Sequence, residues 1–206
     1  MKLYFHPLSS FCHKALIALY EAGVAFEPVV VNLGDPAERA AFAAIWPFAK
    51  FPVLVDGDRV IPESTSIIEY LGTPVSDSFE IRAMDRFFDL HIHMPMQKIV
   101  ADVGKPDANC AAAARAQIET AYDVLESRLG SGWAVGESFS MADCAAAPAL
   151  FYGDLAVPFG PSHPRCRAYL DRLMARPSYA RVLSEAKPFF HWFPLHDRLA
   201  ATYPAL

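Results

Sequence analysis

The sequence KFPVLVDGDRVIPES, from Lys50 to Ser64, contains the strongest structural signal in the chain. Two short apolar runs rich in β-branched residues flank the polar pair Asp56-Gly57, a pattern that predicts a β-hairpin. The second run ends at Pro62, and a helical pattern begins near Ser64. We therefore expect two antiparallel strands followed directly by a helix.

The same stretch has features of a peptide-binding site. The bond before Pro52 can be cis, and such a bend would leave the N–H and C=O of Val53 free to pair with an extended peptide. Ser64, at a helix start, would offer its hydroxyl and N–H to a carboxylate, and Glu63 would bind an ammonium group. These groups suit a small peptide with a free α-amino acid end. An ordinary hairpin followed by a capped helix explains the stretch about equally well.

The residues before the hairpin alternate between strand and helix patterns. Because a crossover helix joins parallel strands and a hairpin joins antiparallel ones, a small mixed sheet is expected. The expected elements are strands at Lys2–Phe5 and Phe26–Val31, and helices from Ser9 or Ser10 to Gly23, from Ala37 to Ile45 and from Ser64 to Leu71.

No strand pattern returns after a polar, proline-bearing segment that follows Leu71. The sequence therefore predicts an α/β domain at 1–72, a linker at 73–79 and an all-helical domain at 80–206. Helices are expected at 79–103, bent at Pro95, and at 110–129, 140–152, 164–175 and 178–186, before an aromatic tail.

Composition narrows the possible functions. The chain has 206 residues, 53% hydrophobic and 20% charged, which is typical of a globular protein. A net charge of −5 argues against nucleic acid as a partner. No membrane span or secretion signal is recognisable. The cysteines show no paired spacing, so free thiols in a reducing cytoplasm are expected for Cys12, Cys110, Cys144 and Cys166.

The first loop, His6 to Lys14, could carry chemistry. A hydroxyl at a helix start lies at the positive end of the helix dipole, where an anion is stabilised. A thiol bound there would ionise more easily than at its free pKa of about 8.5. Ser9 could thus donate a hydrogen bond to a bound thiolate without being a nucleophile. Simple helix capping by Ser9 and Ser10 is the more common role of such residues.

Together these stretches resemble the cytosolic glutathione transferase superfamily over the whole chain. The matching elements are the loop with Ser9, the run Phe51–Leu54, the triplet Pro62–Ser64 and the segment Ser140–Asp143. The resemblance implies a thioredoxin-like N-terminal domain and an α-helical C-terminal domain.

The resemblance also implies roles for single residues in binding glutathione. It implies that the bond before Pro52 is cis and that the backbone of residues Phe51–Val53 lies along the bound glutathione. The backbone of Val53 would then pair with the cysteinyl unit of glutathione. Glu63 and Ser64 match the binders of the γ-glutamyl end, and Lys50 can pair with the glycyl carboxylate. The segment WPFA before Lys50 departs from the family pattern, which often has Asn-Pro and a glycine there.

The phrase His-Pro-x-Ser resembles the bacterial serine-type classes of phi, theta and zeta kind, and in that register Ser9 stabilises the thiolate. Ser10 is the alternative, because aligning Pro7 with the cysteine-type bacterial classes places Ser10 at their active cysteine. Cys12 is a third candidate, although a cysteine inside an apolar helix is usually a buried hydrophobe.

Other polar residues of the helical part have expected roles outside the chemistry. Ser140 and Asp143 form a capping-box pattern, a folding signal worth about 1 kcal/mol or somewhat more. His91 and His93 stand two positions apart, so they point to different helix faces and no metal site is expected. His91, Met94 and Trp192 are candidates for an electrophile pocket, with core packing the alternative for each.

The resemblance implies a glutathione transferase that activates the glutathione thiol for attack on an apolar electrophile. The alternatives are a glutathione-dependent isomerase of the maleylacetoacetate type, thiol transfer through Cys12, and a non-catalytic binding or interaction module. Glutathione is then a co-substrate without a metal, and a homodimer is expected.

Overall fold

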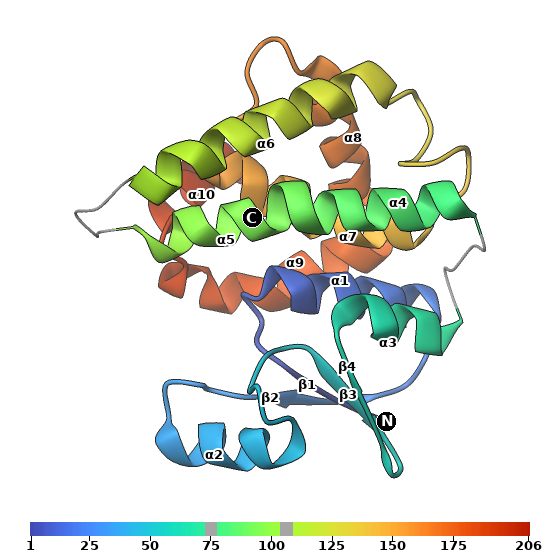
Figure 1. Cartoon of the computed structure of the whole chain (residues 1–206), viewed down its shortest axis with the longest axis vertical. Coiled ribbons are helices and arrows are strands. Elements are labelled where there is room, and N and C mark those ends of the chain that lie inside the picture. Colours follow the sequence, from blue (N-terminus) through green and yellow to red (C-terminus); the bar gives the residue numbers. More distant parts are fainter. Residues whose placement is uncertain (73–77, 104–108) are drawn as a thin grey trace.

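The computed structural model of the chain describes residues 1–72, 78–103 and 109–206. Figure 1 shows a small sheet with α2 (Pro36–Ile45) below it, α1 (Ser10–Glu21) and α3 (Ser64–Leu71) directly above it, and the other helices packed above these two. Within the described residues the last strand ends at Pro62. The thioredoxin-like domain followed by a helical domain is thereby confirmed. Most of the predicted linker, residues 73–77, lies outside the described residues, so the domain boundary stays a prediction.

The sheet has four strands in the order β2-β1-β3-β4. β1 (Lys2–Phe5) runs parallel to β2 (Glu27–Val30) and antiparallel to β3 (Val53–Asp56), which pairs antiparallel with β4 (Arg59–Pro62). In the short turn between β3 and β4, Gly57 has a φ of +58°, which glycine adopts without steric cost. The predicted mixed sheet and hairpin are confirmed.

Side chains of the sheet alternate between two apolar layers. Leu3 and Leu54 are buried in the layer that contains α1 (Ser10–Glu21) and α3 (Ser64–Leu71). On the other face, Tyr4 stacks on Phe42 of α2 (Pro36–Ile45). Figure 1 shows α1 and α3 between the sheet and the helical domain, so both helices contact the two halves of the molecule.

The segment predicted as one bent helix contains three pieces. α4 (Phe79–Phe88) leads into a π-helical turn (Asp89–His93), which leads into α5 (Met94–Ala101). Pro95 has no N–H, so the carbonyl of the residue four positions earlier lacks its usual helical partner. The expected disturbance at Pro95 therefore takes the form of a wider helical turn immediately before it.

α7 (Met141–Ala156) forms the centre of the helical domain, and all its residues are buried. α1 and α4 both pack against it. A Cβ atom on Gly153 would lie 2.8 Å from Oη of Tyr122 and 3.0 Å from a methyl of Ile92, so this position requires glycine for close packing. The remaining helices are α6 (Asn109–Arg128), α8 (Pro164–Ala175), α9 (Pro177–Ala186), a 3-10 helix (Lys187–Trp192) and α10 (His196–Thr202).

A buried ion cluster joins α1 to α3 and α4. Nζ of Lys14, a fully buried side chain, lies 2.7 Å from Asp85 and 2.7 Å from Asp89, and donates to Oγ1 of Thr65 at 2.8 Å. The buried ammonium group thus has two hydrogen bonds, to Thr65 and Asp89, and an ion pair with Asp85. Burial raises the pKa of Asp85 more than Lys14 lowers it. Burial also acts to raise the pKa of Asp89, but hydrogen bonds and charges from His93 and Lys14 outweigh it and the pKa is lowered.

The predicted capping box is present at the start of α7. The backbone N–H of Ser140 donates to the carboxylate of Asp143 at 2.9 Å. That carboxylate, fully buried, also accepts from the N–H of Ala134 at 2.8 Å and from the hydroxyl of Tyr169 at 2.5 Å. Asp143 thus connects α7 to α8 and to the preceding loop as well as capping its own helix.

Replacing Asp143 with alanine should lower the free energy of unfolding by roughly 3 kcal/mol, well above the usual cost of a lost cap, because several buried donors lose their acceptor. Urea unfolding measures this quantity. The control Tyr169→Phe removes a single one of these hydrogen bonds and should cost only about 1 kcal/mol. Equal small costs for the two variants would contradict this account of Asp143.

Candidate active site

The first loop places Ser9 at the N-cap of α1, with extended backbone at φ −77° and ψ 116°. Its N–H donates to the carbonyl of His6 at 3.0 Å, and its Oγ accepts from the N–H of Cys12 at 3.4 Å. Ser9 is half-buried, whereas Ser10, the first residue of the helix, is only 4% exposed. The Ser9 hydroxyl therefore lies at the positive end of the α1 dipole and remains open to a ligand.

The peptide bond between Phe51 and Pro52 is cis, as the family resemblance implied. The expectation of a free strand edge at Val53 is wrong. Val53 is fully buried and is in register with Tyr4 of β1 on one side and Pro62 of β4 on the other. Strands flank it on both sides, so the backbone that can pair with a peptide belongs to the segment before the proline, where Phe51 is half-buried.

Glu63 and Ser64 lie where β4 turns into α3. Glu63 is the N-cap residue of α3, with a φ of +68° that side chains rarely adopt. Its side chain caps no N–H of the helix and is exposed. Ser64 is the first residue of α3 and is 5% exposed. The unusual backbone at Glu63 thus turns the chain so that the carboxylate remains available to a ligand.

A cavity of about 400 Å³ brings most of the predicted glutathione-binding residues together. Ser9, Lys50 and Glu63 come from three separate segments and all line it. Ser10 and Val53 do not. The full lining consists of Ser9, Phe11, Leu33, Trp46, Ala49, Lys50, Phe51, Pro52, Glu63, Ser64, Met94 and Gln97.

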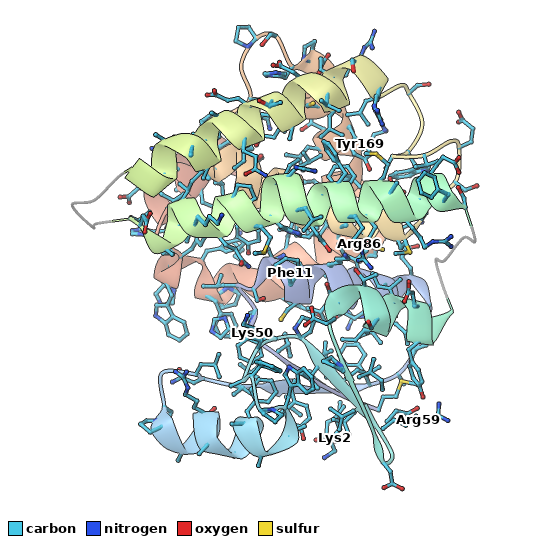
Figure 2. The ribbon with its side chains drawn as sticks, viewed as in Figure 1. Lys2, Phe11, Lys50, Arg59, Arg86 and Tyr169 are labelled. Atoms are coloured by element: carbon cyan, nitrogen blue, oxygen red, sulfur yellow. The ribbon has the colours of Figure 1, made fainter. Side chains whose placement is uncertain are left out.

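The cavity offers charges of both signs and two helix starts. Figure 2 shows Lys50 and Phe11 at the same end of α1, with the lysine on the side of the sheet. Lys50 supplies a cation for a carboxylate, and Glu63 supplies an anion for an ammonium group. The N-termini of α1 and α3 add N–H donors for further anionic groups. This combination fits a zwitterionic peptide that carries a second carboxylate at its other end.

A second cavity of about 560 Å³ adjoins the first. Ser9 and Gln97 line both cavities, so the two spaces meet at these side chains. The rest of the second lining is mostly apolar and comes from the first loop and the start of α1, from α5 and the residues just after it, from α7, and from the segment after the 3-10 helix. It consists of Leu8, Ser10, Met96, Val100, Ala101, Val103, Tyr152, Phe193 and Pro194.

The profile of the glutathione S-transferase N-terminal domain matches residues 3–77, and that of the glutathione S-transferase C-terminal domain matches residues 108–172. Glutathione S-transferase F6 of Arabidopsis thaliana is 30% identical, over 89% of this chain and 99% of its own length. The chain belongs to the glutathione S-transferase family.

Other similar proteins have names that point to other functions. A stringent starvation protein A homologue of Pasteurella multocida is 29% identical over 91% of this chain and 92% of its own length. Among solved structures, the holo form of maleyl pyruvate isomerase, a bacterial glutathione S-transferase of the zeta class, has a TM-score of 0.73 and 25% identity over 88% of this chain and 96% of that one. These relatives leave the class and the reaction open.

Among the candidates for the electrophile pocket, Met94 lines the first cavity, and neither His91 nor Trp192 lines either one. The alternative prediction, that these side chains pack in the core, is also wrong. Met94 is 45% exposed, Trp192 is 62% exposed, and His91 is exposed as well. Sequence reasoning missed the residues that line the second cavity. The sequence does contain one indication of this lining: Met96 and Val100 are apolar and four positions apart, so they share one face of α5.

The two histidines of the π-helical turn lie apart, as their spacing predicted. His91 is exposed, whereas His93 is buried beside Asp89 and under the ring of Phe11. Among the side chains the structure describes, no group of three or more His, Cys, Asp or Glu residues could bind a metal ion. Likewise, no helix in residues 1–72, 78–103 or 109–206 has the length and apolar character to cross a bilayer.

Cys12 is fully buried, and burial raises the pKa of its thiol to about 12. The thiol is therefore protonated at neutral pH and cannot act as a nucleophile. We expect Cys12 to remain unmodified when the folded protein is treated with iodoacetamide at neutral pH, and to be alkylated fully after unfolding in urea. Peptide mass spectrometry assigns the modified residue. Rapid alkylation of Cys12 in the folded protein would contradict the burial and would revive thiol transfer.

A further apolar groove of about 580 Å³ lies between α1, β2 and α9. It is the larger space, but none of the predicted catalytic or glutathione-binding residues lines it. Its polar groups are paired with one another: the hydroxyl of Tyr20 donates to Glu185 at 2.6 Å, and Arg181 lies 2.8 Å from the same carboxylate. The chemistry of this glutathione S-transferase family member is therefore assigned to the cavities at Ser9.

Proposed function

We propose that the protein is a glutathione transferase that binds glutathione in the first cavity and an electrophile in the second. The observation that carries this proposal is the meeting of the two cavities at Ser9, whose hydroxyl lies at the start of α1. A sulfur atom bound beside Ser9 would face the second cavity. Family membership and the relatives named as glutathione S-transferases support the same activity.

Each end of glutathione has a complementary group in the first cavity. In this proposal Lys50 pairs with the glycyl carboxylate, while Glu63 and Ser64 bind the ammonium and carboxylate groups of the γ-glutamyl end. The backbone at Phe51, next to the cis bond at Pro52, pairs with the cysteinyl unit. Phe51 takes the role that the resemblance gave to Val53, because Val53 lies inside the sheet.

The chemical step needs a thiolate at neutral pH. The Ser9 hydroxyl would donate a hydrogen bond to the sulfur, and the α1 dipole would favour its negative charge, so the thiol proton passes to solvent. The thiolate electron pair then forms a bond to an electrophilic carbon of the second substrate, which lies next to it. A leaving group departs with its electron pair or, in an addition, the substrate carbanion takes a proton from water.

Calorimetry with glutathione and a conjugation assay with chlorodinitrobenzene test this proposal. We expect saturable glutathione binding and turnover above the uncatalysed rate. Absence of both would overturn it.

Two alternatives keep specific support. The likeness to maleyl pyruvate isomerase favours glutathione-dependent cis–trans isomerisation. The stringent starvation protein A homologues, which are not named as transferases, favour a non-catalytic interaction module. Tight binding of an apolar dye without any heat from glutathione would select the module. Turnover of a maleyl acid without conjugation would select the isomerase.

We further propose a cytoplasmic homodimer. Large apolar side chains are exposed on both halves of the molecule, with Phe48 72% and Phe79 73% exposed, which suits a contact with a second copy. Sedimentation velocity reports the state of assembly. The buried free thiols of Cys12, Cys144 and Cys166 suit a reducing compartment.

A further inference from the structure

Among the residues that the structure describes, none that lines the second cavity is an acid or base that ionises at neutral pH. Apart from the hydroxyls of Ser9, Ser10 and Tyr152 and the carboxamide of Gln97, its lining is apolar. No lysine, arginine or histidine among the described residues lines it, so these residues offer a bound carboxylate no cation. An ionised carboxylate without a partner is costly in such surroundings.

Gln97 occupies a special position between the two cavities. It lines both of them, together with Ser9, and its side chain is exposed rather than packed in the core. It follows Met94 by three positions on α5 and precedes Ala101 by four, so these residues share one helix face. Met94 lines the first cavity and Ala101 the second, which places Gln97 at the junction of the two cavities.

We propose that Gln97 is a specificity-determining residue that selects uncharged electrophiles with a hydrogen-bond-accepting oxygen next to the reacting carbon. This inference rests on the proposed function. Negative charge develops on such an oxygen when the thiolate attacks, and the carboxamide N–H of Gln97 can donate a hydrogen bond to it. A carboxylate-bearing electrophile gains no pairing in the same place.

The inference separates this chain from the isomerase alternative. A maleyl acid carries carboxylates, and the part of the second cavity that the structure describes offers them only neutral donors. Dicarboxylate isomerisation is therefore disfavoured here, although the fold is shared with an isomerase.

A matched pair of substrates tests the proposal. Methyl 2-chloro-3,5-dinitrobenzoate is neutral, and its parent acid is an anion at neutral pH. Both have the same nitro groups, and in both the ester or carboxylate oxygens lie next to the reacting carbon. In both, the sulfur of glutathione bonds to the ring carbon, the carbon–chlorine bond breaks, and chloride leaves with the electron pair. The thiol proton goes to solvent. Each kcat/KM is divided by the uncatalysed rate constant for the same substrate.

We expect the wild-type protein to prefer the ester over the acid by roughly 30-fold or more, the range set by one missing charged hydrogen bond. Gln97→Leu should lower kcat/KM for the ester roughly tenfold and leave the KM for glutathione nearly unchanged. Gln97→Arg should raise kcat/KM for the acid and reduce the ester preference by roughly tenfold or more. Lys98→Leu, on the same helix but lining neither cavity, is the matched control and should leave the ester preference as in the wild type.

Equal use of ester and acid by the wild-type protein would overturn the proposal, as would an unchanged ester preference in Gln97→Arg. Glutathione affinity, measured by calorimetry on each variant, separates this failure from that of the proposed function. If glutathione binds and the neutral ester is conjugated without preference, only the role of Gln97 fails. If glutathione does not bind, the proposed function fails and the inference fails with it.

Discussion

Ser9→Ala should lower kcat/KM for glutathione conjugation by roughly 100-fold, because the variant loses the hydroxyl that donates to the thiolate. Loss of one donor to a developing or bound anion typically costs on this scale in a site of low polarity. The affinity for glutathione should change little, since the contacts at Lys50, Glu63 and Ser64 remain. Steady-state kinetics with chlorodinitrobenzene and calorimetry with glutathione measure the two quantities.

Ser9 also caps α1, so the variant must be separated from a loss of fold. Ser9→Thr retains a hydroxyl and a capping group, and should retain most of the activity. Ser9→Asp retains the cap but places a negative charge beside the sulfur, and should be at least as inactive as the alanine variant. A larger loss in Ser10→Ala than in Ser9→Ala would contradict the choice of Ser9, because Ser10 lies outside the glutathione cavity.

Lys14→Met should lower the free energy of unfolding by about 3–5 kcal/mol, because Asp85 and Asp89 lose their ion pairs with a buried cation, and the Arg86 side chain that also lies 3.3 Å from Asp85 is largely exposed. Asp85 is fully buried and Asp89 nearly so, and both lie 2.7 Å from Nζ of Lys14. The aliphatic part of methionine fills a similar volume, so the loss reflects charge rather than a cavity. Chemical denaturation of the folded protein measures the change.

Two comparisons make the Lys14 prediction specific. Lys2→Met removes an exposed lysine paired with Glu27 at 3.2 Å, and should cost less than about 1 kcal/mol. Combining Lys14→Met with Asp85→Asn and Asp89→Asn removes the stranded charges and should recover part of the lost stability. A cost for Lys14→Met as small as that for Lys2→Met would show that the cluster does not stabilise the fold.

The sequence was informative where short-range chemistry governs structure. The Asp56-Gly57 turn, the proline at position 52 and the capping pattern of Ser140 and Asp143 are each determined by neighbours a few positions away. The hairpin, the cis bond and the capping box are all present. The matching order of these motifs along the chain also identified the family.

Features that depend on contacts between segments far apart in the sequence could not be predicted from the sequence. Val53 was placed at a sheet edge because its pairing with β1 cannot be derived from the hairpin alone. The sequence shows Lys14 as a lysine in an apolar helix. Its ion pair could not be predicted, because its partner Asp89 lies 75 positions later in the chain. The second cavity combines side chains of α5 and α7 with Phe193, and no local pattern indicates that these meet.

The ionisation of bound glutathione tests the central claim most directly. Thiolate absorbs in the ultraviolet where the thiol does not, so a pH titration of the saturated complex, with the titration of the protein alone subtracted, gives the pKa of the bound sulfur. We predict a value at least about one unit below that of free glutathione in the wild-type protein, and a return toward the free value in Ser9→Ala. A bound sulfur that titrates as in free glutathione, or one equally acidic without the Ser9 hydroxyl, would contradict the account.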